Sequence, residues 1–419
     1  GTSTNVYKGT VSHWVKRSGL GAMGTFAAWN NGVSDTNRAY LNFNNDDIYF
    51  YDQANSMILE TNRKFRDTSA WYHIVLAWDT SQSTASDRVK IYVNGVQETS
   101  FSTENYPSQN STLVFNTSGR TFGLGSYANS GSAAGFFDGS MSHFHFTDGY
   151  TYAASAFGST DATTGEWQIN TSPSVTYGNN GFFILKDGNS VTDQSGNSNN
   201  FTVGGGTLTK TEDCPSNVFA TLNAITPNSN NNRAGGTRHF NNSGTYDMRH
   251  STLAVSKGKW YAEFYIADMT GGFTIVGIQD TTQFDDYSFI TGSSRGYGYR
   301  SNGDKGNNNS SSSFGNSFTS GDYIGVAVDL DNNKIYFSKN GVWQNSGDPT
   351  SGATGTGSAF DITDGYDYCI ATSSNDAGTD QITDVNFGNG YFNVNAVSSA
   401  GTNASGIGIF EYDVPTGYT

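Results

Sequence analysis

The chain has 419 residues, which is enough for two domains of ordinary size with a core each. Gly, Asn, Ser and Thr are abundant while Lys and Arg together number only 22, and this composition favours β structure. A formal net charge of −15, with no cluster of basic residues, argues against nucleic acid or an anionic membrane as partner. No apolar run is long enough to insert into a membrane.

The first half is predicted to form short strands separated by polar turns, at intervals typical of a β-sandwich. The predicted strands are Val11–Val15, Tyr40–Phe43, Ile48–Tyr51, Trp71–Trp78, Lys90–Val93, Ser140–Phe146 and Phe182–Leu185. We expect this first domain to span residues 1–203 and to be followed by a linker at 204–215, which contains three consecutive glycines and a Cys-Pro pair.

The second domain is predicted to span residues 216–419. Its predicted strands are Trp260–Ala267, Phe273–Gln279, Gly296–Tyr299, Tyr323–Leu330, Lys334–Val342 and Tyr368–Thr372. Residues 301–313 are rich in Ser and Asn and hold nothing for a core, so we expect a mobile surface loop there. The Asp- and Asn-rich stretch 329–333 is predicted to be a hairpin turn between two strands.

One strand-turn-strand unit occurs in both halves. Lys90–Val96 in the first half corresponds to Lys334–Val342 in the second, and each unit has alternating apolar residues and an Asn-Gly turn. Asn-Gly is a strong hairpin signal because both turn positions need positive φ. Trp71–Trp78 leads into the first unit and Tyr323–Leu330 into the second. Two antiparallel meanders of one design predict two β-sandwiches in tandem, and favour recognition surfaces over a catalytic cleft.

The second half resembles the SPRY family over about residues 250–392. The motifs that carry the resemblance are Ser256–Glu263, Gly321–Asp329 and Ile335–Trp343. The resemblance implies a bent β-sandwich that binds protein partners or glycans through loops at one end and that is not catalytic.

The first half, residues 1 to about 203, resembles laminin-G-like sandwiches of the concanavalin type. The motifs are Ala70–Val75, Val89–Gly95 and Phe137–Gly139. Together the two resemblances imply an all-β protein of two tandem antiparallel β-sandwiches, both concanavalin-like jelly rolls.

The ordered pair of domains, with Asp161–Gly165 and Asp193–Asn197 between them, resembles virion proteins of tailed phages. This resemblance implies a tail-fibre or capsid-surface adhesin on the virion surface, binding host glycan or protein and contacting other virion proteins. Fibre proteins are commonly homo-oligomers, often trimers. There are two alternatives: a structural decoration protein of capsid or tail that binds no host ligand, and a secreted bacterial adhesin. Because residue 1 is Gly, we expect a processed chain or a fragment.

No pattern typical of an enzyme is found. Concanavalin-type glucanases alternate Glu and Asp along one strand so that two carboxyl groups flank a sugar bond. Here Glu occurs at seven positions, and none is two residues from an Asp along a strand. A nucleophile elbow, a zinc-binding helix motif and a phosphate loop are also absent from the sequence. We therefore expect no catalytic residues.

Metal sites have little support in the sequence. Calcium is the more plausible ion, because relatives of the first domain often hold it with loop oxygens, and Asp193, Asn197 and Asn199 form the best cluster. His143 and His145 should face one side of a strand, which a half-exposed polar face explains without zinc. Cys214 and Cys369 can pair or stay free. No cofactor other than calcium is expected.

Ligand recognition is predicted in the second domain. Tyr297 and Tyr299 share one strand face between Arg295 and Arg300, and aromatic rings beside Arg and Asn suit sugars. Trp343, after a hairpin turn, is a further candidate. The alternative is that both tyrosines belong to the core, as buried aromatic residues usually do.

Overall fold

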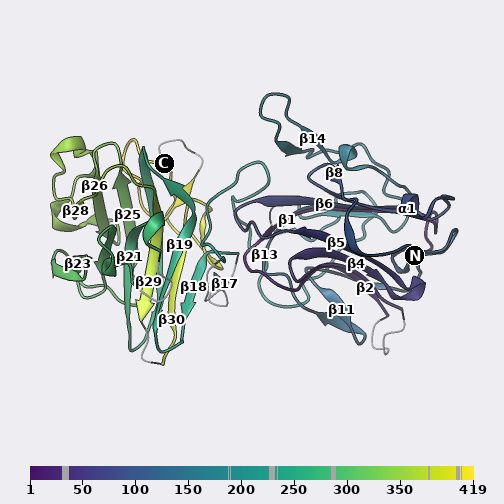
Figure 1. The fold of residues 1–419 in the computed structure, drawn as a ribbon, viewed down its shortest axis with the longest axis horizontal. Coiled ribbons are helices and arrows are strands. Elements are labelled where there is room, and N and C mark those ends of the chain that lie inside the picture. Colours follow the sequence, from purple (N-terminus) through teal and green to yellow (C-terminus); the bar gives the residue numbers. More distant parts are fainter. Residues whose placement is uncertain are drawn as a thin grey trace. The chain divides into compact units, whose positions relative to one another are not determined.

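The computed structural model describes residues 1–30, 37–186, 188, 190–225, 232–233, 235–284, 289–375, 378–402, 406 and 408–419. It is nearly all-β and confirms the predicted fold class (Figure 1). The chain forms two compact units: residues 1–210 with 214–218, and residues 211–213 with 219–419. In the described part of the chain, no helix has the length and apolar character needed to cross a membrane.

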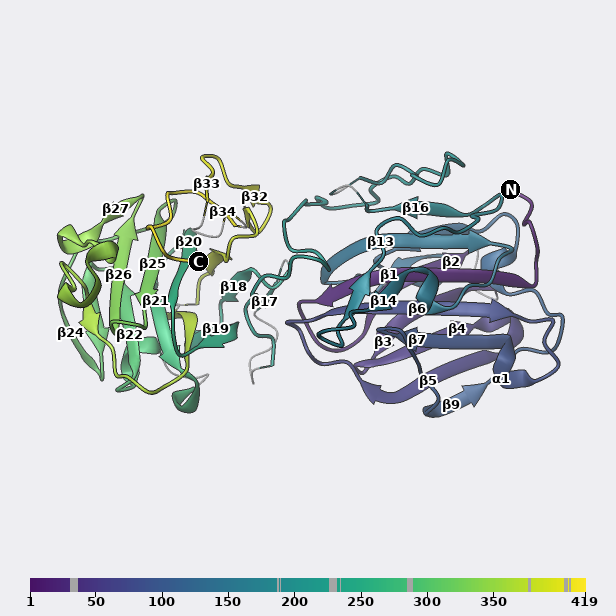
Figure 2. The ribbon, with the colours of Figure 1, turned by 90° about the horizontal axis from the view of Figure 1, so that it is seen from above.

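The first unit is a sandwich of two six-stranded antiparallel sheets. One sheet has the order β16 (Phe182–Ile184), β13 (Gly139–Asp148), β1 (Lys8–Arg17), β6 (Trp71–Asp79), β7 (Val89–Val93) and β8 (Val96–Gln97), and Figure 2 shows most of these strands side by side. The other has the order β10 (Thr121–Leu124), β2 (Met23–Trp29), β3 (Ala39–Asn44), β4 (Asp47–Asp52), β5 (Met57–Lys64) and β9 (Phe101–Asn105).

Short elements complete this unit. They are the hairpin β11 (Tyr127–Asn129) with β12 (Ser132–Ala134), the hairpin β14 (Gly158–Thr160) with β15 (Trp167–Ile169), helix α1 (Ala85–Arg88), and 3-10 turns at Gln53–Asn55, Val114–Asn116 and Ala154–Ala156. The core between the two sheets is aromatic. Phe26 stacks on Phe115 with ring centroids 4.8 Å apart, and Trp78 donates its indole N–H to the Asn116 side-chain oxygen at 2.7 Å.

The second unit is also built on two sheets. The larger has the order β17 (Asn232–Arg233), β18 (Arg238–Asn241), β30 (Gln381–Asn386), β20 (Lys259–Met269), β25 (Tyr323–Asp329), β26 (Lys334–Lys339) and β27 (Val342–Trp343), with β28 (Phe360–Asp361) also paired to β26. The smaller has the order β19 (Tyr246–Val255), β29 (Tyr368–Asn375), β21 (Phe273–Asp280), β22 (Gly296–Arg300), β23 (Asp304–Asn307) and β24 (Ser310–Ser313).

The remaining elements of this unit are short. They are the hairpin β31 (Tyr391–Phe392) with β32 (Asn395–Ala396), the hairpin β33 (Gly401–Thr402) with β34 (Ile409–Phe410), and 3-10 turns at Thr281–Gln283, Ile290–Gly292, Gln344–Ser346 and Pro349–Thr354.

The two predicted meanders are confirmed. The turn between β7 and β8 has φ of 49° at Asn94 and 80° at Gly95, and the turn between β26 and β27 has φ of 47° at Asn340 and 78° at Gly341. Positive φ at both positions is the conformation that Asn-Gly favours. The predicted turn at 329–333 is confirmed as well, since the Asn332 amide donates to the Asp329 carboxylate at 3.0 Å between β25 and β26.

The loop predicted at residues 301–313 is wrong, because most of this stretch forms the hairpin β23–β24 at the edge of a sheet. Asn308 and Asn309 make its turn with φ of 52° and 58°. Main-chain pairing forms this hairpin together with polar side chains, such as Lys305 donating to the Ala359 carbonyl and Asn307 donating to the Gly296 carbonyl. A sequence without core residues therefore still gives strands here. The four serines of β24 are all exposed, as a surface segment should be.

Glu263 of β20 holds the C-terminal segment onto the second unit. Its fully buried carboxylate accepts the main-chain N–H groups of Glu411 at 2.7 Å and Tyr412 at 2.9 Å, and the Tyr261 hydroxyl at 3.0 Å. Next to this contact, Phe410 packs edge-on against Tyr261 at 5.1 Å.

Replacing Glu263 with Ala should therefore destabilise the second unit. Two main-chain donors lose their acceptor, which costs about 1–3 kcal/mol of unfolding free energy. Chemical denaturation measures that loss, and hydrogen exchange should show the C-terminal residues 409–419 losing protection first. Unchanged protection there would contradict this role for Glu263.

Candidate functional site

Tyrosine side chains gather on the outer face of the second sheet in the first unit. Along β3 and β4, Leu41 and Phe50 point into the core, and alternation places Tyr40, Tyr49 and Tyr51 on the opposite face. Tyr40 is paired with Tyr51 across the two strands. Tyr127 of β11 joins them. These four half-buried residues, Tyr40, Tyr49, Tyr51 and Tyr127, are called the tyrosine face below.

The rings of the tyrosine face are in mutual contact. Centroids lie 5.2 Å apart for Tyr40 and Tyr51, 5.6 Å for Tyr40 and Tyr127, and 6.2 Å for Tyr49 and Tyr51. The Arg38 guanidinium lies 5.7 Å from the Tyr40 centroid and donates to the Ala128 carbonyl at 3.0 Å. Burial raises the pKa of Tyr49 to about 12, so its phenol stays neutral and keeps a hydroxyl that donates and accepts.

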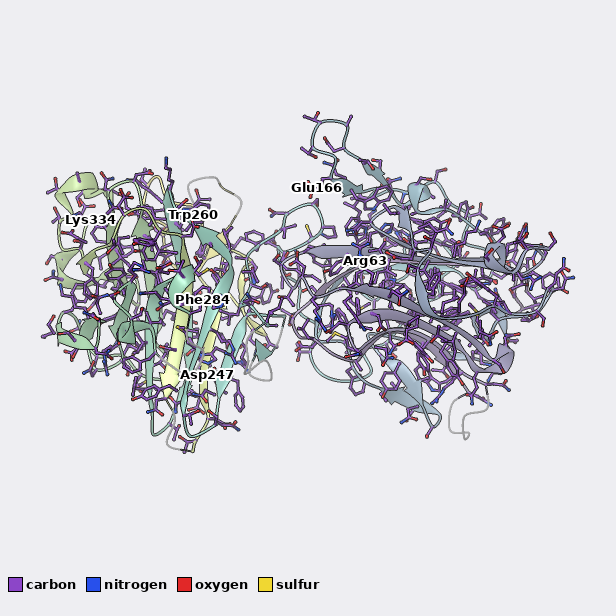
Figure 3. All side chains as sticks on the ribbon, viewed as in Figure 1. Arg63, Glu166, Asp247, Trp260, Phe284 and Lys334 are labelled. Atoms are coloured by element: carbon purple, nitrogen blue, oxygen red, sulfur yellow. The ribbon has the colours of Figure 1, made fainter. Side chains whose placement is uncertain are left out.

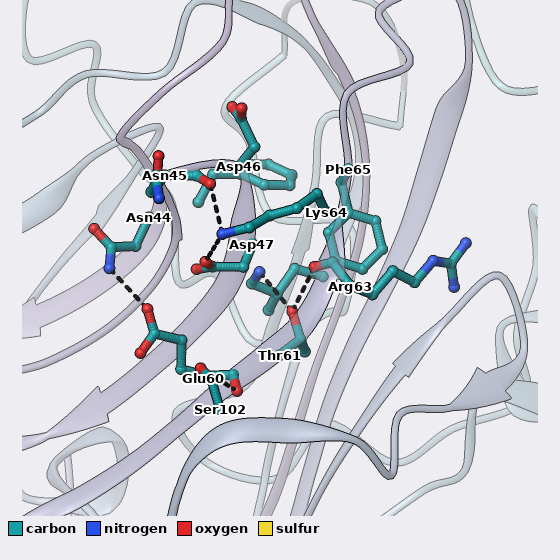
Figure 4. A network of polar contacts seen from close by, with 12 residues as sticks. Asn44, Asn45, Asp46, Asp47, Glu60, Thr61, Arg63, Lys64, Phe65 and Ser102 are labelled. Atoms are coloured by element: carbon teal, nitrogen blue, oxygen red, sulfur yellow. Dashed lines mark hydrogen bonds and ion pairs between the residues drawn. The ribbon is translucent and has the colours of Figure 1, made fainter.

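A network of polar side chains lies on β3, β4 and β5 next to the tyrosine positions in the strand register, and Figure 4 shows this network from close by. Glu60 is paired with Tyr49 across the strands and accepts from Asn44 at 3.1 Å. Lys64 donates to the Asp47 carboxylate at 2.5 Å and to the Asn45 carbonyl at 2.9 Å, so this pair of charges is neutralised locally. Arg63, also labelled in Figure 3, lies on the exposed end of β5, where its carbonyl accepts the Thr61 hydroxyl and its guanidinium is ion-paired with Glu98. The border thus offers amide and carboxylate groups with little net charge.

This arrangement suits a saccharide. A sugar needs an apolar plane to stack on and hydrogen-bond donors and acceptors around it, and tyrosines bordered by Asn and Glu supply both. The same groups do not make a metal site. Within the residues that the structure describes, no group of three or more His, Cys, Asp or Glu side chains is arranged to hold a metal ion.

A second candidate surface is a shallow groove of 570 Å³ at one end of the first sheet. The Lys8 ammonium lies 3.1 Å from the Asp79 carboxylate there, and Tyr150 is 37% exposed. Most of the hydrogen-bonding capacity of Asp79 is already used by Ser81 and Gln82. The groove therefore offers one exposed ring and a neutralised charge pair, and is a weaker match to a sugar than the tyrosine face. Its lining residues are Asn5, Lys8, Asp79, Gly149, Tyr150, Thr151 and Tyr152.

The tyrosines predicted to bind ligand in the second unit are core residues. Tyr297 is 4% exposed and Tyr299 is fully buried, and Tyr299 stacks on Phe337 at 5.4 Å. The prediction that these two rings bind a ligand is wrong, and the alternative that both belong to the core is confirmed. Strand β22 turns this face toward the other sheet of its sandwich.

The other three predicted residues do not share a surface with those tyrosines. Arg295 is ion-paired with Asp280 and lies 4.1 Å over the Tyr366 ring. Arg300 lies 5.3 Å from the Phe273 centroid. Trp343 is half-buried with its ring 6.4 Å from that of Tyr261. These local contacts explain the positions of Arg295, Arg300 and Trp343 without a ligand. The five predicted residues therefore do not assemble into one site.

The predicted calcium cluster is a hydrogen-bonded loop. The Asp193 carboxylate accepts from the amides of Phe183 at 2.8 Å and Asn199 at 2.9 Å, and from the Ser195 hydroxyl at 2.8 Å. Asn197 and Asn199 both direct their side-chain NH2 groups at the Gly181 carbonyl, at 2.9 Å. Calcium needs six or more oxygens. In this geometry the Asp193 oxygens are already satisfied, and both Asn side chains direct NH2 groups at the Gly181 carbonyl, so the residues present do not fit the ion.

His143 and His145 do not form the half-exposed pair that strand alternation predicts. His143 has φ of 45°, and the pairing of β13 with β1 shifts register there. His145 is 2% exposed and stacks on Phe183 at 3.9 Å. The face is buried because residues 151–177 cover it, which the irregular sequence of that stretch does not reveal. Cys214 and Cys369 are both free.

Comparisons with known proteins agree with this architecture. Residues 2–151 match the concanavalin A-like lectin/glucanases superfamily, in its laminin-G group, and residues 259–360 match the SPRY domain. The chain therefore contains a laminin-G-like domain followed by a SPRY domain, as the sequence predicts.

Among solved structures, the SPRY domain of human HERC1 is similar at 22% identity, over 36% of this chain and 87% of that chain, with a TM-score of 0.28. A similarity of this size supports no further inference. No curated protein matches the chain significantly.

Proposed function

From a laminin-G-like domain in tandem with a SPRY domain, we propose a non-enzymatic surface protein of a tailed-phage virion, of tail-fibre or adhesin type, that attaches the particle to the host. Domains of both kinds suggest a binding role. The resemblance of the ordered pair to phage virion proteins supports the location on a virion surface.

The tyrosine face carries the proposal. Three tyrosines on one sheet face and the neighbouring Tyr127 of β11, bordered by Asn44 and Glu60, support a role in recognition. Since the chain carries a net charge of −15, it repels acidic polymers, and the ligand that fits best is an uncharged host glycan.

The absence of catalysis is supported by the carboxyl groups. Glu263 has its pKa raised to about 7 by burial, partly opposed by its three hydrogen-bond donors, and such a shift is typical of a general acid. Its side chain is fully buried and holds the main chain of residues 411–412, so no substrate reaches it. Glu60, beside the tyrosine face, is hydrogen-bonded to Asn44 and Thr103.

Weak single sites fit attachment by an oligomer. One shallow face makes few contacts, but a second contact made by a tethered copy is effectively intramolecular and raises avidity by 10²–10⁴. We propose a homo-oligomer, with a trimer as the form expected of fibre proteins.

An adsorption-blocking experiment tests the function. Host cells saturated with the purified oligomer should adsorb fewer phage particles, and labelled antibody should place the protein on the exposed virion surface. Normal adsorption, together with a regular lattice of the protein on the capsid, would favour the decoration protein. A protein absent from the particle would favour the bacterial adhesin.

Replacing Tyr49 and Tyr51 with Ala tests the site. Each truncation removes a stacking ring, so the affinity for an uncharged polysaccharide should fall about tenfold per residue, equivalent to about 1.4 kcal/mol. Affinity electrophoresis in polysaccharide gels measures the change. Tyr150→Ala, in the groove, is the matched control and should bind normally. Loss of binding in Tyr150→Ala alone would move the site to the groove.

A further inference from the structure

A hairpin segment covers the outer face of the first sheet in the first unit. This segment, residues 153–176, is called the strap; it contains β14 and β15, and Figure 1 shows β14 extending beyond β8, with Glu166 labelled in the same hairpin in Figure 3. Phe157 is 2% exposed and packs with Val75 of β6, and the half-buried Trp167 joins the same apolar cluster. Phe157 and Trp167 therefore anchor the strap, together with the buried Ala154.

His73 of β6 lies under the strap and bonds to it. The ring stacks between Trp14, at 4.8 Å, and Trp167, at 5.9 Å. The indole N–H of Trp167 donates to His73 Nδ1 at 2.9 Å, and His73 Nε2 lies 2.8 Å from the Ser12 hydroxyl. An indole nitrogen only donates, so Nδ1 has to be unprotonated, and the ring's single proton is on Nε2 and is donated to Ser12.

This contact is incompatible with a charged imidazole. A second proton on His73 has to bind Nδ1, where it meets the N–H of Trp167, and two donors then face each other. The imidazolium is also fully buried among aromatic rings, which costs free energy unless a partner compensates. Moving Trp167 away removes both penalties, because it frees Nδ1 and admits water.

Among the residues that the structure describes, no carboxylate compensates a charge on this ring. Several titratable groups surround the contact between His73 and the strap. They are His13 of β1, His143 and His145 of β13, Tyr92 of β7, and Tyr152 and Tyr177, which directly precede and follow the strap. Burial and the neighbouring His13 lower the pKa of His73 to about 3. Burial, His143 and His73 also lower the pKa of His145. The acidic residues of the strap, Asp161 and Glu166, lie at its hairpin turn.

We propose that the strap is an acid-released cover: proton uptake by His73 expels Trp167, opens residues 153–176 and uncovers the aromatic surface of β1 and β6, while the core of the sandwich stays folded. The direction follows from linkage. The closed form binds the proton more weakly than the open form, whose His73 titrates near the ordinary value of about 6.5, so acid favours opening. The opening equilibrium constant rises about tenfold for each pH unit below 6.5.

Hydrogen exchange on the whole chain tests the proposal. Main-chain amides of β14 and β15, corrected for the intrinsic effect of pH, should lose protection by about 100-fold between pH 7 and pH 4.5. The amides of Ile74 and Leu76, in the middle of β6, report global unfolding. Acid lowers their protection as well, because buried histidines of this unit titrate on unfolding, but they should stay better protected than the strap amides at every pH. If the strap amides and these β6 amides have the same protection at pH 4.5, the unit unfolds as a whole and the proposal is overturned.

Two variants distinguish opening of the strap caused by protonation of His73 from opening caused by weaker packing of the strap. His73→Asn keeps an acceptor oxygen near the Nδ1 position but does not titrate, so its strap should stay closed at pH 4.5. Trp167→Phe removes the indole donor and should open the strap more at pH 7, with a smaller response to acid. His250→Asn, in the second unit, is the control and should behave as wild type. Opening of His73→Asn over the wild-type pH range would overturn the proposal, and so would an unchanged acid response in Trp167→Phe.

Discussion

Asp46→Ala should lower the free energy of unfolding of the first unit by about 3–5 kcal/mol, because it leaves a buried guanidinium without its counter-charge. The side chain of Arg17 is fully buried. It donates to Asp46 at 2.9 Å, to the Phe65 carbonyl at 2.6 Å and to the Gly21 carbonyl at 3.0 Å. Without the carboxylate, the charge of Arg17 keeps only neutral acceptors in a low-dielectric interior.

Asp46 also organises the chain around it. Its carboxylate accepts the Gly21 amide at 2.6 Å and the Arg66 side chain at 2.9 Å. Burial opposes ionisation, but these bonds and Arg17 outweigh it and lower the pKa of Asp46. A lowered folded-state pKa means that the stabilisation is present at neutral pH and is lost as pH falls through that value.

Denaturant unfolding, followed by hydrogen exchange of core amides in β6, measures the effect in this unit. Arg66→Ala is the matched control: its side chain is 57% exposed, so removing it should cost less than about 1 kcal/mol. Similar losses in Asp46→Ala and Arg66→Ala would show that burial of Arg17 does not set the cost.

His13→Leu should stabilise the first unit, and more so in acid. His13 is fully buried, stacks on Phe144 at 4.8 Å, and neither of its ring nitrogens has a hydrogen-bond partner. Leu has a similar volume and removes two unsatisfied polar atoms, which should raise the free energy of unfolding by about 1–3 kcal/mol at pH 7.

The acid dependence comes from the same ring. Burial lowers the pKa of His13 to about 3, whereas in the unfolded chain it is near 6.5. Between these values the unfolded state binds more protons, so stability falls as pH decreases, by about 1.4 kcal/mol per unit and by nearly 3 kcal/mol at pH 4.5.

His13→Leu lacks this term, so its advantage over wild type should widen by that amount between pH 7 and pH 4.5 in denaturant titrations. His250→Leu, in the second unit, is the control and should leave the acid response of the first unit unchanged. An advantage of constant size for His13→Leu would contradict the account.

The sequence predicts the architecture well where local chemistry decides it. Asn94 with Gly95, and Asn340 with Gly341, specify turns through their φ preferences, and these turns fix the two meanders. Irregular pairing is harder to predict. The serine-rich β24 has no apolar pattern, and its pairing with β23 uses main-chain groups that every residue carries.

The site was less predictable, because the choice of face depends on tertiary packing. Alternation puts Tyr297 and Tyr299 on one face, but only the position of the second sheet shows that this face is the core. Tyr40, Tyr49 and Tyr51 alternate in the same way within predicted strands, and their spacing was the available signal. Their meeting on the outer face depends on the cross-strand register of Tyr40 with Tyr51, which sequence alone does not specify.

The central claim is that the first unit presents its tyrosine face as a recognition surface. The most direct test of this claim is equilibrium binding of the purified oligomer to host cells. Wild type should bind saturably, and an excess of the matching uncharged polysaccharide should displace it. The Tyr49→Ala, Tyr51→Ala double variant, with an unchanged unfolding transition, should bind about 100-fold more weakly if the two losses add. Equal binding by the folded double variant and wild type, or no binding by wild type, would contradict the account.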